Sequence, residues 1–138
     1  MKIKIRDNGM YTPGYATSSA AGCDLKAMIE TRVLPGGCTI VPTGVCIALP
    51  DGYEGQVRGR SGLNFKHSLV VPTGTIDADY RGEIYVKIYN LSLKDYIIRP
   101  GDRIAQLIIS KVERAEWEIV EDLDDTDRGN NGFGSSGK

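Results

Sequence analysis

The stretch Glu83-Ile84-Tyr85-Val86-Lys87-Ile88-Tyr89 decides the fold class, because branched apolar residues alternate along it with aromatic and charged ones. Successive side chains of a β-strand point to opposite faces, so the isoleucines and the valine share one face of this segment. Such a face predicts a strand that contributes to a core. The opposite face carries two tyrosines. Exposed tyrosines are ordinary on a strand, and cover from outside the monomer would explain them equally well.

Shorter runs of the same kind lie on both sides of this stretch. Glycine and proline separate them, which is typical of turns between strands. The segments that we expect to be strands are 2–6, 39–41, 45–49, 83–89, 104–109 and, last in the chain, 117–120. Only Ser61–His67 could form a helix of more than one turn. Many short strands at near-regular spacing predict an all-β fold, as a sandwich, a barrel or a jelly roll.

Length and composition narrow the functional classes. A chain of 138 residues with 41% hydrophobic residues predicts one domain with a substantial core. We expect neither membrane insertion nor export, because the chain opens on no charged-then-apolar leader and contains no apolar run of about 18–20 residues. A net charge of −1 argues against a general nucleic-acid binder. Three widely spaced cysteines fit no zinc pattern and predict a reducing, cytosolic compartment.

Five glycine-marked segments interrupt the strands and carry polar residues that a β-core does not need. They are residues 21–27, 59–63, 74–82, 100–106 and 128–137. In the first segment, Asp24 is either a turn former or an acidic anchor for a hydrated cation. In the second, Arg60, Ser61 and the amides that follow could bind an anion at the start of a short helix, although an ordinary serine N-cap is the commoner case.

The third and fourth segments add a carboxylate and an amide. Asp77 and Asp79 lie on the same side of an extended chain, next to Tyr80. One of them could act as a general base for water, and the tyrosine offers a flat face to a sugar or base. The pattern alone favours a simple hairpin with an acidic turn. Gln106 interrupts a buried strand and needs a partner, since a buried amide without one costs about 1–3 kcal/mol.

The fifth segment, Arg128-Gly129-Asn130-Asn131-Gly132-Phe133-Gly134-Ser135-Ser136-Gly137, has the composition of a mobile tail. Its arginine, four glycines, two hydroxyls and one aromatic ring also describe a flap that could order over a phosphate chain.

In this order, the five segments resemble the five motifs of trimeric dUTPases (deoxyuridine triphosphate nucleotidohydrolases). The resemblance runs from about residue 12 to residue 137. The matching motifs are Ala-Gly-x-Asp-Leu, Arg-Ser-Gly-Leu, Ile-Asp-x-Asp-Tyr-Arg-Gly, Gly-Asp-Arg-Ile-Ala-Gln and Arg-Gly-x-x-Gly-Phe-Gly-Ser. Gly59, Pro72, Thr75 and Asn131 depart from the usual residues. One motif alone would be weak evidence, whereas five in the right order are specific.

The resemblance implies a distorted jelly-roll β-barrel that forms a homotrimer, with active sites at the subunit boundaries. Residues 1–127 would form the barrel, and residues 128–138 would be a flexible tail that closes over a site of another subunit. The implied reaction is hydrolysis of dUTP to dUMP and pyrophosphate by Mg²⁺-assisted attack of water on the α-phosphorus. This reaction limits uracil incorporation into DNA and supplies dUMP for dTMP synthesis. The implied location is the cytoplasm, or also the nucleus in a eukaryote.

The resemblance also implies roles for individual residues. Asp77 matches the general base, Asp24 matches the acidic residue that meets Mg²⁺ through water, and Tyr80 matches the residue that packs on deoxyribose and excludes a 2′-hydroxyl. The hairpin 71–76 matches the region that pairs with uracil. The other implied substrate-binding residues are Arg60, Ser61, Gly62, Gly74, Ile76, Gln106, Arg128, Phe133, Gly134 and Ser135.

Two other readings stay open from the sequence. The dCTP deaminases have a related fold, but their chains are generally longer and carry a catalytic glutamate near the base, whereas the motifs around Ser61 and Asp77 favour the hydrolase. A regulator that binds control proteins is the other class. The presence of Asp77 argues that catalysis is retained, and a regulatory partner cannot be read from the sequence.

Overall fold

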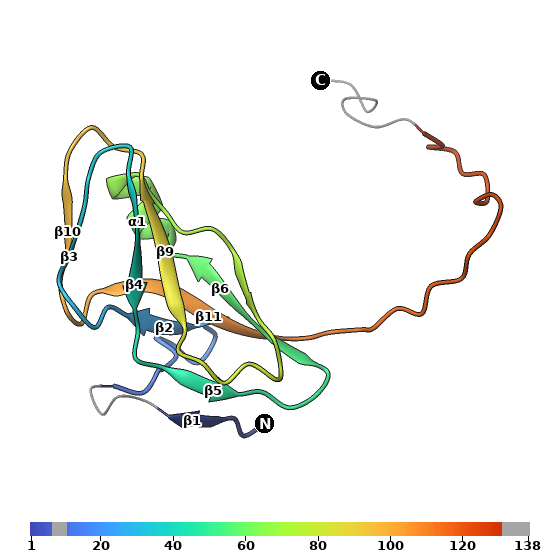
Figure 1. Cartoon of the computed structure of the whole chain (residues 1–138), viewed down its shortest axis with the longest axis horizontal. Coiled ribbons are helices and arrows are strands. Elements are labelled where there is room, and N and C mark those ends of the chain that lie inside the picture. The colour runs from blue at the N-terminus through green and yellow to red at the C-terminus, as the bar shows by residue number, and fades with distance from the viewer. Residues whose placement is uncertain (7–10, 131–138) are drawn as a thin grey trace.

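The computed structural model describes residues 1–6 and 11–130, and nearly all of its regular structure is antiparallel β-strand (Figure 1). In chain order the elements are β1 (Lys4–Arg6), β2 (Cys23–Lys26), β3 (Thr31–Val33), β4 (Cys38–Pro42), β5 (Cys46–Ala48), β6 (Tyr53–Gly59), α1 (Ser61–His67), β7 (Leu69–Val70), β8 (Gly74–Ile76), β9 (Tyr85–Asn90), β10 (Tyr96–Ile98) and β11 (Arg103–Lys111). The all-β prediction is confirmed, and the predicted helix lies where the sequence places it.

The strands form four small sheets around one core. The largest sheet has the order β2-β11-β6-β8, the second has the order β4-β9-β7, and two further pairs are β1-β5 and β3-β10. The seven residues of β6 pair along their whole length with β11, from Gly59 opposite Ala105 to Tyr53 opposite Lys111. Of the predicted site residues, Gln106 lies on this ladder, and Arg60 and Ser61 follow the end of β6.

The alternation that predicted β9 is confirmed by burial. Val86 and Ile88 are fully buried, and Ile84, just before the strand, is also buried. On the other face Tyr85 is exposed and Tyr89 is half-buried, with the Lys87 ammonium 5.0 Å from the Tyr89 ring centre. Fully burying a branched apolar side chain contributes roughly 1.5–3 kcal/mol, so this inward face anchors the second sheet.

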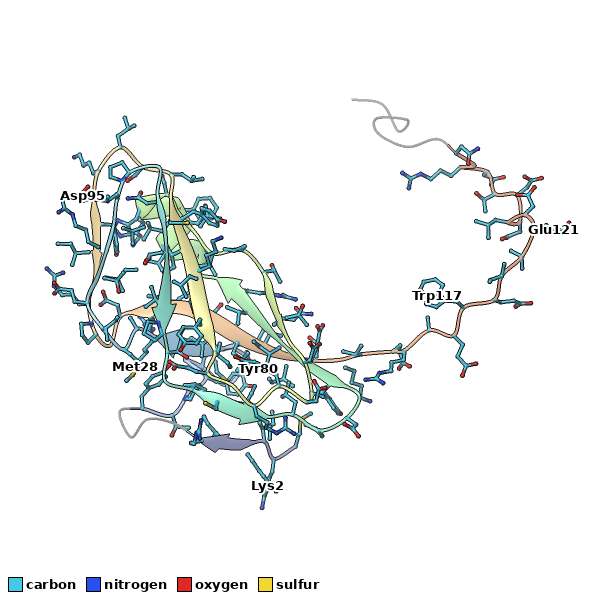
Figure 2. The ribbon with its side chains drawn as sticks, in the orientation of Figure 1. Lys2, Met28, Tyr80, Asp95, Trp117 and Glu121 are labelled. Carbon is cyan, nitrogen blue, oxygen red and sulfur yellow. The ribbon has the colours of Figure 1, made fainter. Side chains whose placement is uncertain are left out.

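The predicted strand at residues 117–120 is wrong for this chain on its own. These residues adopt no regular structure, and Trp117 and Ile119 are 90% and 99% exposed. The segment that follows β11 runs away from the barrel, as the labelled Trp117 and Glu121 show (Figure 2). A strand needs a neighbour for its backbone groups, and this segment meets none within residues 1–6 and 11–130.

All three cysteines are free thiols. Within the described residues, no helix is both long enough and apolar enough to cross a membrane.

Helix α1 ends in an unusual backbone conformation. Ser68 has φ 54° and ψ 31°, and every other residue with a positive φ in the described part of the chain is a glycine. Its N–H donates to the Asn64 carbonyl at 2.8 Å, and its own carbonyl accepts a hydrogen bond from Leu91 N–H at 3.0 Å. The left-handed position after a helix is normally a glycine, because a Cβ is strained there.

We therefore expect Ser68→Gly to stabilise the protein by about 0.5–1 kcal/mol, since relief of this strain outweighs the added freedom of the unfolded chain. Urea unfolding at a fixed protein concentration measures the change. Ser110→Gly, the same substitution inside strand β11, should instead destabilise the protein. Equal effects from the two variants would contradict the strain at Ser68.

Candidate active site

One face of the largest sheet collects polar residues from three strands. The pairing register places Gln106 of β11 opposite both Asp24 of β2 and Arg58 of β6. Residues directly opposite each other on neighbouring strands share a face. The row continues along β6 with Gln56 and Glu54. The residues that alternate with this row, Gly55 and Val57, are buried. The sheet thus presents its core side inward and a row of hydrogen-bonding groups outward.

The start of α1 lies at one end of this row. Arg60, not Ser61, occupies the N-cap position: its backbone is extended, and its carbonyl accepts the N–H groups of Leu63 and Asn64 at 3.1 and 3.2 Å. Ser61 and Gly62 are therefore the first helical residues, and both are exposed. The N–H groups of a first helical turn have no acceptor within the helix, so they can serve an anion. This geometry fits the predicted anion site.

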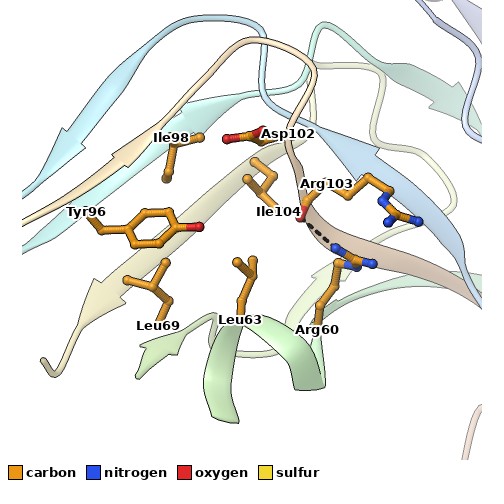
Figure 3. Close-up of a pocket in the computed structure, with 8 residues that line it drawn as sticks. All are labelled: Arg60, Leu63, Leu69, Tyr96, Ile98, Asp102, Arg103 and Ile104. Carbon is orange, nitrogen blue, oxygen red and sulfur yellow. Dashed lines mark hydrogen bonds between the residues drawn. The ribbon is translucent and has the colours of Figure 1, made fainter. Parts of the chain in front are cut away.

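Asp24 contacts both Arg60, the N-cap of α1, and Arg103, the first residue of β11. The residue is only 8% exposed, and its carboxylate lies between two guanidinium groups. Oδ1 is 3.3 Å from Arg60 Nε, and Oδ2 is 3.4 Å from Arg103 Nη1. Arg60 Nη1 also donates to the carbonyl oxygen of Arg103 at 3.0 Å, the bond drawn in Figure 3. One buried anion therefore holds cations from the second and fourth glycine-marked segments.

The Asp24 carboxylate is also the predicted contact for the waters of a bound Mg²⁺. Oδ1 is buried and makes no hydrogen bond to the described residues, because its contact with Arg60 lacks hydrogen-bond geometry. The described residues contain no group of three or more His, Cys, Asp or Glu side chains suited to a metal. The described residues therefore offer no metal site built from protein ligands alone. Asp24 Oδ1 is an acceptor that a metal-bound water could use. This fits Mg²⁺, which keeps several waters.

The two arginines lie at one side of a small pocket (Figure 3). Its volume is about 240 Å³, and it is lined by Arg60, Leu63, Leu69, Tyr96, Ile98, Asp102, Arg103 and Ile104. The Tyr96 ring packs on His67 with 4.9 Å between ring centres, and burial raises the pKa of its hydroxyl above the ordinary value. Arg103, the first residue of β11, thus lines the same pocket as the apolar residues of α1, β7 and β10.

Asp77 lies at the opposite end of the sheet. It follows β8, whose Ile76 pairs with Gly55 and whose Gly74 pairs with Val57 of β6. Its side chain is exposed, and its carbonyl accepts the Tyr80 N–H at 3.1 Å, which closes a turn. The residue lines a depression of about 830 Å³ whose other members are Asp51, Gly52, Tyr53, Glu54, Thr75, Ala78, Asp79, Val112 and Arg114.

Tyr80 is held against a glycine. Its hydroxyl donates to the Glu83 carbonyl at 2.8 Å, and a Cβ added to Gly82 would lie 2.3 Å from that hydroxyl oxygen. A side chain at position 82 therefore cannot coexist with this ring position. Glu83 is fixed in turn, because its Oε1 accepts the Gly44 N–H at 2.6 Å.

The predicted site residues of one chain thus form two separate groups. Strand β6 spans roughly 20 Å at about 3.3 Å per residue, and Ser61 follows one of its ends while Asp77 lies near the other. Arg128 lies on the exposed segment that leaves the barrel (Figure 1). The predicted residues Phe133, Gly134 and Ser135 lie outside the described residues.

Comparison with known proteins identifies the family. The model of the dUTPase family matches residues 9–137. The chain belongs to the dUTPase family.

Its relatives agree with that membership. The chain is 50% identical to the deoxyuridine 5'-triphosphate nucleotidohydrolase of Anaplasma marginale over 99% of both chains, and 52% identical to that of Rickettsia typhi over 99% of this chain and 96% of the relative. The structure of Staphylococcus bacteriophage 80alpha dUTPase with dUpNHpp matches with a TM-score of 0.93, at 28% identity and 99% coverage of both chains. The structure of a D95N mutant dUTPase from phage phi11 of S. aureus, described with a structural Mg(II) ion, matches with a TM-score of 0.85 at 25% identity. The match covers 91% of this chain and 100% of that chain.

The predicted family, the dUTPase-like jelly-roll fold and the enzyme class of dUTP diphosphatase are therefore confirmed.

Two arginines of the dUTPase-like site were missed by reasoning from the sequence. Arg103 belongs to the fourth motif, and only the structure shows that it meets Asp24. Arg58 faces the polar row beside Gln106 and donates to the Gln56 amide oxygen. The alternation of polar residues at positions 54, 56 and 58 was the signal that could have found Arg58.

Proposed function

We propose that this chain hydrolyses dUTP to dUMP and pyrophosphate, with Mg²⁺ assisting the attack of a water on the α-phosphorus. The observation that supports this most is the family match over residues 9–137, which contains all five motif segments. Hydrolysis of dUTP limits uracil incorporation into DNA and supplies dUMP for dTMP synthesis. A cytoplasmic location belongs to the same proposal.

Asp77 is the proposed general base. Its exposed carboxylate sits on a turn that is closed by the Tyr80 N–H, so the backbone beneath it is fixed. A carboxylate in this position can orient a water and accept its proton as the oxygen attacks phosphorus. The bond to the pyrophosphate leaving group then breaks.

The start of α1 is the proposed triphosphate site. The first-turn amides of Ser61 and Gly62, the Ser61 hydroxyl, the Arg60 guanidinium and the Gln106 amide all lie at one end of the sheet. Phosphoryl-group hydrolysis depends mainly on positioning and charge stabilisation, and these donors supply both. Bound Mg²⁺ would supply further charge neutralisation, and Asp24 would meet its hydration shell.

The edge of the sheet supports recognition of the nucleoside. Strand β8 is the last strand in the order β2-β11-β6-β8, so one side of its backbone has no strand partner in the described part of the chain. Edge strands present N–H and C=O groups that another molecule can pair with. We propose that Gly74 and Ile76 pair with uracil in this way, while the Tyr80 ring packs on the deoxyribose.

We propose that the active site is shared between subunits of a homotrimer. One chain holds Asp77 and Ser61 at opposite ends of β6, so a complete site has to combine groups from different chains. Apolar surface supports an assembly: Ile40 and Tyr85 are exposed on the outer face of the second sheet, and Trp117 and Ile119 are exposed on the arm after β11. Residues 128–138 would then close over a site of another subunit.

Pyrophosphate release from dUTP, dCTP, dTTP and UTP, with and without Mg²⁺, tests the proposed function. We expect release from dUTP that depends strongly on Mg²⁺, and little release from the other three nucleotides. Turnover of dCTP without turnover of dUTP would favour the deaminase-like alternative and contradict the proposal.

Replacing Asp77 with asparagine should lower kcat for dUTP by about 10²–10⁴-fold, the usual contribution of a general base. The substitution keeps the size and shape of the side chain, so the KM for dUTP and the thermal midpoint should change little. Steady-state kinetics and thermal unfolding measure both. Near-normal turnover would remove Asp77 from the proposed role.

Mixing two inactive variants tests the shared site directly. We expect Asp77→Asn and the double variant Ser61→Ala/Gln106→Ala, reassembled together at equal amounts, to recover up to about a quarter of wild-type activity, since random subunit exchange gives that fraction of sites with both intact groups. Each variant alone should stay inactive. No recovery after proven subunit exchange would mean that one chain supplies both groups.

Gly82→Ala should relax the discrimination against UTP, because the new methyl group displaces the Tyr80 hydroxyl from Glu83. The ratio of kcat/KM for dUTP to that for UTP should fall about tenfold or more, which corresponds to about 1.4 kcal/mol. Gly14→Ala is a control of the same chemistry, because Gly14 is exposed, has open space around it and does not have a left-handed backbone conformation. An unchanged ratio in Gly82→Ala would argue against sugar packing by Tyr80.

A further inference from the structure

We propose that Arg103 is a positioning residue for the triphosphate: through Asp24 it fixes the guanidinium of Arg60 at the start of α1. This inference rests on the proposed function and concerns how its phosphate-binding end is held.

A β-bulge aims Arg103 at this end of the sheet. In the pairing of β11 with β2, Arg103 is opposite Lys26 and Ala105 is opposite Leu25, so β11 advances two residues while β2 advances one. The consecutive residues Ile104 and Ala105 are both buried as a result. Residues three apart on a regular strand point to opposite faces. The bulge removes this offset and brings Arg103 to the face that carries Gln106.

Burial makes the carboxylate at the centre an effective anchor. The Asp24 side chain is 10% exposed, the Arg60 side chain 26% and the Arg103 side chain 51%. A buried carboxylate needs partners, because removal of its charge from water is costly. Asp24 has one guanidinium at each of its two oxygens, so the Arg103 contact limits the directions in which the carboxylate, and with it Arg60, can turn.

The hydrogen bond from Arg60 to the start of β11 does not depend on the Arg103 side chain. Arg60 Nη1 donates to the main-chain carbonyl of Arg103, which any residue at that position would provide. Arg103→Gln therefore removes the guanidinium and its contact with Asp24, and leaves this backbone hydrogen bond in place. Two mechanisms then differ: Arg103 can act through Arg60, or its exposed guanidinium can touch the phosphates itself.

A double-mutant cycle in binding separates these mechanisms. The variants are Arg103→Gln, Arg60→Gln and the double variant, with the non-hydrolysable analogue dUpNHpp as the probe. Calorimetry gives its Kd with Mg²⁺ and with EDTA, and kcat and KM for dUTP are measured in parallel. Arg32→Gln is the matched control, because it removes the same charge from an exposed ion pair between Arg32 of β3 and Asp95, the residue before β10.

We expect Arg103→Gln to weaken binding of the analogue about 5–20-fold, with and without Mg²⁺, and to raise KM more than it lowers kcat. In the Arg60→Gln background the same change should have little further effect, because energies of residues that act through one another do not add. Arg103→Lys keeps the positive charge but not the planar guanidinium with its fixed N–H donors. This variant should therefore recover binding only in part.

Three results would overturn the inference. Additive effects in the cycle would make Arg103 a direct phosphate contact. Binding equal to that of Arg32→Gln, with or without a lower melting temperature, would make it a structural residue only. A loss seen with Mg²⁺ and not with EDTA would place its role at the metal. Failure of the wild-type protein to bind dUpNHpp or to hydrolyse dUTP would instead contradict the proposed function.

Discussion

The pairing of β6 with two neighbours is the constraint on which the site depends. β6 lies between β11 and β8, and its register with each is antiparallel and unbroken. The ladder fixes which of its residues face outward, and it sets the distance between the helix that follows β6 and the turn that follows β8. The proposed phosphate-binding groups and the proposed base are thus held in fixed positions that are far apart within one chain.

Much of the fold could be predicted from the sequence because the inward residues of several strands are branched and apolar. β9 is the clearest case, since its alternation fixes both its type and its buried face. β6 was missed, because its buried positions are Gly55 and Val57, and a single valine makes no pattern. The segment 117–120 was wrongly predicted as a strand for the opposite reason: it is apolar, but a pattern carries no information about whether a partner strand exists.

The candidate site was likewise predictable in part: its residues could be named from the sequence, but their arrangement in space could not. The types of residue and their order identified the family, and the start of α1, Asp77 and Gln106 could each be named from their motifs. Their arrangement could not. Asp24, Arg60 and Arg103 are far apart in sequence but form ion pairs in the structure. The Arg103 contact also depends on a β-bulge that the local sequence does not predict. The N-cap position of Arg60 was also unexpected, because serine is the commoner capping residue.

The separation of Asp77 from Ser61 within one chain has a physical consequence for how the proposed site can be assembled. An active site built within one barrel would have to bend β6, and the ladder resists this because each of its residues from Tyr53 to Gly59 is paired with β11. Bringing a second chain's β8 turn to the start of α1 costs no such distortion, and burial of exposed apolar surface such as Ile40 and Trp117 can stabilise the assembly. A stiff sheet that separates the two groups within a chain therefore favours a site shared between chains.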